Sequence, residues 1–130
     1  GCIAFSPLAQ GLLTDRYLNG VPADSRMNRP GGQSLKVDHV SPENVARIKG
    51  LNDIAAQRGQ TLAQMAVAWV LRDPRVTSAL IGASKPAQIS ELVGAVKNLN
   101  FDAATLSAID ELAVDGGVNL WQNPSTDQRP

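Results

Sequence analysis

The sequence predicts a parallel α/β fold that is only part of a larger domain. Two short apolar strands, at residues 2–5 and 77–81, are separated by two stretches of helical periodicity, and two more such stretches follow the second strand. This order is typical of a parallel sheet covered by helices. Because a parallel strand needs neighbours on both sides and the first strand starts at the second residue, we expect a C-terminal piece of a larger domain.

Length and composition narrow the possible fold classes and partners of the protein. The 130 residues are about half of the roughly 250 that a complete (β/α)8 barrel needs. A content of 43% hydrophobic and 18% charged residues is ordinary for a globular protein. Twelve basic residues balance twelve acidic ones, so we expect neither nucleic acid nor an anionic membrane as a partner.

Cysteine and histidine are too few for a disulfide or a metal cluster. Cys2 and His39 are the only residues of their types. No apolar run approaches the roughly 18 residues of a membrane span, and the N-terminus lacks the basic region of a secretory signal. We therefore expect a cytoplasmic protein without a metal, while the balanced charge leaves its oligomeric state open.

The first strand runs directly into a turn with features of a phosphate site. Ser6 offers a hydroxyl, Pro7 fixes the backbone, and Gly11 lets the chain pass close to a ligand. Unpaired N–H groups from Leu8 onward would then surround a pyrophosphate. The alternative is a plain strand-to-helix connection, in which Ser6 is a cap and Gly11 a turn residue.

A long loop rich in Gly and Pro is expected from Asn19 to His39. A loop of this length in a compact domain is usually functional or disordered. Arg16 and Arg26 flank its start and can reach the phosphates of a ligand, although most loop arginines are merely solvated. His39 has no orienting partner that the sequence identifies, so we assign it no general-base role.

The helix after this loop has clear boundaries. Ser41 is placed to cap it, Pro42 suits the first helical position, and Gly59 supplies a stop. Apolar residues between them recur at helical spacing, which indicates one face packed on a core.

The following helix is expected to be buried. Thr61 and Gln64 form a capping-box pattern at its start, and Asp73 with the proline after it ends it. Its sequence is apolar almost all round, so Met65 and Trp69 are interpreted as core residues rather than as ligand contacts.

The second strand leads into a turn with a more specific anion-binding pattern. Gly82 permits close approach, Ser84 can bond both a helix and a ligand, and Lys85 places a cation beside a helix N-terminus. Gln88 and Glu91, three residues apart, can meet the sugar and base of the same ligand. The alternative is a capped surface helix with ordinary polar residues.

Two helices complete the chain. The first, capped by Ser84, is expected to carry one apolar side, made of Ile89, Leu92, Val93, Val96 and Leu99. The second starts at Asp102, with Phe101 and Leu106 placed as a hydrophobic staple. Residues 123–130 read as a polar tail.

Three segments resemble the C-terminal third of the aldo-keto reductases. They are residues 4–14 (AFSPLAQGLLT), 63–71 (AQMAVAWVL) and 80–91 (LIGASKPAQISE), and together they span most of the chain in order. Within the family, residues 24–27 and 119–122 favour the bacterial branch of L-glyceraldehyde 3-phosphate reductases over the potassium-channel β subunits.

The resemblance implies a (β/α)8 barrel that binds NADPH, with the two strands as its seventh and eighth and residues 1–122 as an incomplete portion of the domain. It assigns the pyrophosphate to Ser6, Pro7, Leu8 and Gly11, the support of the phosphates to Arg16 and Arg26, and the adenosine 2′-phosphate end to Gly82, Ser84, Lys85, Gln88 and Glu91. Two positions depart from the family pattern. Arg16 stands where relatives often have lysine, and Leu92 where many have an asparagine that contacts adenine.

The family's catalytic Asp, Tyr, Lys and His have no matching position in this sequence. The resemblance therefore implies a segment that binds the hydride donor of an enzyme reducing aldehydes or ketones, such as glyceraldehyde 3-phosphate or methylglyoxal. Two alternatives stay open: the cofactor-binding module of a protein like the channel β subunits, and a truncated product that is inactive alone.

Overall fold

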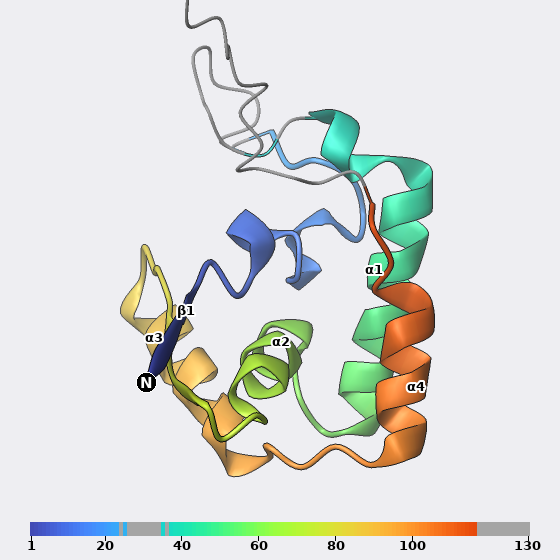
Figure 1. The fold of residues 1–130 in the computed structure, drawn as a ribbon. Coiled ribbons are helices and arrows are strands. Elements are labelled where there is room, and N and C mark those ends of the chain that lie inside the picture. Colours follow the sequence, from blue (N-terminus) through green and yellow to red (C-terminus); the bar gives the residue numbers. More distant parts are fainter. Residues whose placement is uncertain (24, 26–34, 36, 117–130) are drawn as a thin grey trace, which may run out of the picture.

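A computed structural model of the chain describes residues 1–23, 25, 35 and 37–116. Two strands, β1 (Cys2–Phe5) and β2 (Val76–Leu80), pair in parallel, so the described fold is mixed α/β. Helix α2 (Leu62–Leu71) lies between the strands and the paired helices α1 (Pro42–Gln57) and α4 (Ala103–Leu112) (Figure 1). Helix α3 (Pro86–Val93) packs against α2 beside the strands.

The second strand starts and ends one residue earlier than the sequence predicts. Pairing begins where Cys2 lies opposite Val76 and ends where Phe5 lies opposite Leu80. β1 ends at Phe5, so Ile81, which the sequence predicts as the last residue of the second strand, has no partner on β1.

The two faces of this small sheet differ. On one face, Ala79 packs against a buried cluster from α2 and α3 that includes Val67, Ala68 and Leu92. Large apolar side chains on the strands are exposed instead: Ile3 is 67%, Phe5 59% and Leu80 62% exposed. Since parallel sheets are normally covered on both faces, this exposure agrees with part of a larger α/β domain.

Helix α1 has the predicted boundaries. The Ser41 side chain accepts a hydrogen bond from the Asn44 amide at 3.2 Å, Pro42 is the first helical residue, and Gly59 follows the helix end with φ +68°. Gly50 allows α4 to come close, because a Cβ there would lie 2.8 Å from Leu112 Cδ1.

The starts of α2 and α4 are also confirmed. Thr61 and Gln64 form both bonds of the capping box, and Asp102 accepts a hydrogen bond from the Thr105 amide at 2.7 Å. Met65 is buried, and Trp69 packs half-buried against the same core, with the Arg72 guanidinium over its ring.

The helix after β2 differs from its prediction in two ways. It begins at Pro86 with Lys85 as the N-cap residue, so Ser84 is not the cap. Its expected apolar side is also divided: Leu92 is buried and Leu99 packs on the core, whereas Ile89, Val93 and Val96 are exposed. Helix α3 ends at Val93, and Val96 lies in the 3₁₀ helix Gly94–Lys97 that follows it. The residues of this segment that are buried against α2 are Leu92 and Ala95.

The loop expected at 19–39 is described only in part. At its ends the chain forms short 3₁₀ helices, Asp15–Tyr17 and Val37–Val40, so His39 lies in a helical turn rather than in an irregular loop. Arg26 and the tail at 123–130 lie outside the described residues, and the predictions for them stay predictions. In the described ranges no helix is long and apolar enough to cross a bilayer.

Candidate functional site

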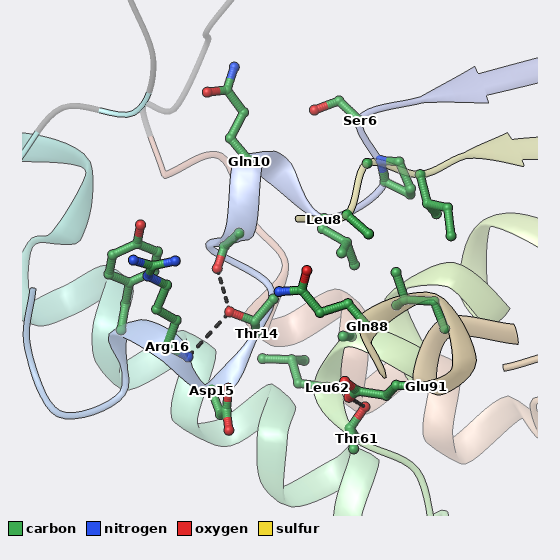
Figure 2. Close-up of a pocket in the computed structure, with 18 of the residues that line it drawn as sticks. Ser6, Leu8, Gln10, Thr14, Asp15, Arg16, Thr61, Leu62, Gln88 and Glu91 are labelled. Atoms are coloured by element: carbon green, nitrogen blue, oxygen red, sulfur yellow. Dashed lines mark hydrogen bonds between the residues drawn. The ribbon is translucent and has the colours of Figure 1, made fainter. Parts of the chain in front are cut away.

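A cavity of about 1030 Å³ opens where the carboxyl ends of β1 and β2 meet. Residues from the two predicted turns lie around it (Figure 2). Of the predicted site residues, it brings together Ser6, Pro7, Leu8, Gly11, Arg16, Gly82, Ser84, Gln88 and Glu91. Lys85 is adjacent, at the N-cap of α3, but does not line the cavity, and Arg26 is outside the described residues.

The first turn, Ser6 to Gly11, is folded tightly on itself. Three of its non-glycine residues have positive φ: Ser6 at 54°, Ala9 at 45° and Gln10 at 57°. This left-handed region is uncommon for residues with a side chain, and its clustering at one turn is typical of functional sites. Gly11 follows with φ at 98°, a value that only glycine adopts without strain.

This folding contradicts part of the prediction of unpaired amides from Leu8 onward. The Ala9 amide donates to Ser6 O at 3.0 Å, and the amides of Gly11 and Leu13 both donate to Leu8 O, at 2.8 and 3.2 Å. These N–H groups are satisfied inside the turn. The first turn therefore presents its side chains to the cavity more than a row of amide donors.

Thr14 is a cavity residue that sequence reasoning missed. Its hydroxyl donates to Gly11 O at 2.7 Å and accepts from the Arg16 amide at 3.2 Å, as drawn in Figure 2. It caps the 3₁₀ helix that carries Arg16 and fixes that residue relative to the first turn. The signal was available, because a threonine followed by an aspartate is a common helix start.

The second turn gathers donors around a single point. Gln88 Oε1 accepts from the Ser84 amide at 2.9 Å, the Lys85 amide at 3.1 Å and the Ser84 hydroxyl at 3.2 Å. All three donors precede the first turn of α3, where the helix dipole favours negative charge. Such a set of donors suits an oxygen of an anionic group.

Glu91 is held from the neighbouring helix. Its Oε1 accepts a hydrogen bond from the Thr61 hydroxyl at 2.8 Å, and its backbone carbonyl accepts from Gln64 Nε2 at 2.8 Å. Thr61 also lines the cavity. The sequence identified Thr61 and Gln64 only as a capping box. No local pattern indicates that they also bind Glu91, which lies 30 residues after Thr61.

The clear pKa shifts occur away from this cavity. Before β2, hydrogen bonds from the Arg75 side chain hold the pKa of Asp73 well below its usual value. Burial lowers the pKa of Arg58, whose guanidinium lies over the Phe101 ring and donates to Asn100 O. Within the described ranges no three His, Cys, Asp or Glu side chains gather as a metal site. The residues around the cavity therefore offer groups that can bind a ligand.

Known bacterial reductases are similar to almost all of this chain. It is 52% identical over 127 residues to the L-glyceraldehyde 3-phosphate reductase of Escherichia coli strain K12, and 51% identical to that of strain O157:H7. Each match covers 96% of this chain but only 37% of the relative, so the chain spans little more than a third of the length of these proteins. The resemblance to the bacterial branch is thereby confirmed. Residues 1–114 also match the aldo/keto reductase family, and the chain belongs to that family.

Proposed function

We propose that this chain supplies the NADPH-binding face of a reductase that converts aldehydes to alcohols. The observation that carries the proposal is the convergence of three donors on Gln88 Oε1, at the edge of a cavity that both turns share. An oxygen of the adenosine 2′-phosphate would take the place of the Gln88 oxygen. Lys85, next to these donors, would add a positive charge.

The first turn is proposed to lie along the pyrophosphate. Because several of its amides bond within the turn, binding would rely on side chains, namely the hydroxyl of Ser6 and the guanidinium of Arg16. Arg16 can hold a phosphate with two parallel hydrogen bonds, which a lysine cannot do. Gly82 has no heavy atom within 4 Å of the place where a Cβ would be, so that backbone is open to close approach.

In this proposal the residues of the chain bind and orient. NADPH, when bound, supplies a hydride to the carbonyl carbon of the substrate. The proton for the carbonyl oxygen would come from the family's tyrosine, outside this sequence, so none of the residues named above has a proton to move. Glyceraldehyde 3-phosphate is proposed as the substrate because two relatives are named L-glyceraldehyde 3-phosphate reductases. Strands β1 and β2 are proposed as the seventh and eighth of the complete barrel.

The test is a cofactor titration of the full-length protein that carries this sequence. Lys85→Glu reverses a charge beside the proposed 2′-phosphate, so we expect NADPH affinity to fall by about tenfold or more, while NADH affinity changes little. Lys97→Glu is the matched control, because it makes the same change at an exposed position outside the cavity. Equal losses for the two cofactors would refute the role of Lys85.

A further inference from the structure

We propose that Thr61 is a positioning residue that orients the Glu91 carboxylate for the adenosine end of the cofactor. The inference rests on the proposed function and assigns a role to a residue that the binding motifs do not include. Thr61 and Glu91 both line the cavity but come from different helices, and Figure 2 shows their side chains meeting.

The Thr61 hydroxyl both accepts and donates a hydrogen bond. It accepts a hydrogen bond from the Gln64 amide at 3.2 Å, which caps α2, and it donates its own hydrogen to Glu91 Oε1 at 2.8 Å. With the cap bond in place, the hydroxyl hydrogen points away from α2. A single hydroxyl therefore starts one helix and holds a carboxylate on the next.

Gln64 adds a second link between the same two helices. Its Oε1 accepts from the Thr61 amide at 3.0 Å, and its Nε2 donates to the Glu91 carbonyl at 2.8 Å. A Cβ at Gly94 would lie only 2.6 Å from Gln64 Nε2, so the glycine leaves the space that this amide occupies. The capping box of α2 thus holds Glu91 by both its backbone and its side chain.

Because Glu91 is charged, the position of its carboxylate affects ligand binding. A carboxylate near a phosphate site repels the ligand unless it faces a hydrogen-bond donor, and the donors at the adenosine end of NADPH are the adenine amino group and the ribose 3′-hydroxyl. Glu91 is an exposed side chain, which without a partner would sample many rotamers. Its bond to Thr61 occupies one oxygen, and no described residue bonds Oε2. Fixing the carboxylate before binding reduces the entropy lost on binding.

Paired variants of the full-length protein separate this role from helix capping. Asparagine and aspartate both cap a helix well, but only asparagine has hydrogens to donate to Glu91. We expect Thr61→Asn to keep the wild-type NADPH affinity and Thr61→Asp to lower it about fivefold by fluorescence titration, with both variants melting near the wild-type temperature. In a Glu91→Ala background the two variants should bind NADPH equally.

Several outcomes would overturn the inference. Equal affinities of Thr61→Asn and Thr61→Asp in a protein that binds NADPH would show that Thr61 serves only as a cap. A difference that persists in the Glu91→Ala background would show that residue 61 acts directly on the ligand. If the wild-type protein did not bind NADPH, the proposed function would fail as well, so the two failures are distinguishable.

Discussion

The two turns that line the cavity follow equivalent strands but are built differently. The first has four residues at positive φ, and its amides donate to its own carbonyls. The second has no positive φ at any residue, and its donors converge on Gln88, a side chain able to rotate away. One turn is thus fixed in shape by its own hydrogen bonds, whereas the other keeps its donors grouped around a replaceable oxygen. Under the proposed function both turns would bind anionic groups of the cofactor, the first through side chains and the second through the donors that now bond Gln88.

The largest effect that would separate the two turns comes from alanine at Gly11 and Gly82. Gly11 has φ +98°, so Gly11→Ala should lower the unfolding free energy by about 1–2 kcal/mol. Gly82 has no positive φ and open space around it, so Gly82→Ala should leave stability nearly unchanged and weaken NADPH binding. Urea unfolding and cofactor titration of the full-length protein measure the two effects. Equal stability losses would contradict the comparison.

A smaller effect concerns how helices start in the two halves of the structure. At the start of α3 the Lys85 amide donates to the uncharged side-chain amide of Gln88, whereas at the start of α4 the Thr105 amide donates to the Asp102 carboxylate. The hydrogen bond from the Thr105 backbone lowers the pKa of Asp102 below its value in an unfolded chain. Its contribution to stability is therefore present above about pH 4 and is lost as the pH falls through the lower, folded pKa.

Asp102→Asn isolates this contribution, because asparagine caps without titrating. The wild-type protein should be the more stable of the two at pH 7, and the difference should shrink as the pH falls below about 4. The difference between their urea unfolding free energies, followed against pH, measures it. A difference that stayed constant over that range would sink the assignment to Asp102, and the same titration of Gln88→Ala should show no such slope.

The features predicted correctly from the sequence are those with local causes. Ser41, Thr61 and Asp102 cap their helices because a short polar side chain bonds an amide two or three residues on, which spacing alone reveals. At the second turn the same reasoning misplaced the cap, because Ser84 precedes the N-cap residue and shares its acceptor, Gln88, with Lys85.

The features that the sequence did not reveal depend on contacts between distant segments. The link from Thr61 to Glu91 joins residues thirty apart, and no periodic pattern encodes it. The exposure of Ile89 and Val93 depends on which elements cover α3, which helical spacing does not specify. The internal bonding of the first turn follows from positive φ at Ala9 and Gln10, residues that rarely adopt it.

The most direct test of the account is a crystal structure of the full-length protein with NADPH. We predict that an oxygen of the 2′-phosphate lies within hydrogen-bonding distance of the Ser84 amide and hydroxyl and the Lys85 amide, with the Gln88 oxygen displaced from them. A 2′-phosphate bound away from this turn, with Gln88 still accepting all three hydrogen bonds, would contradict the account.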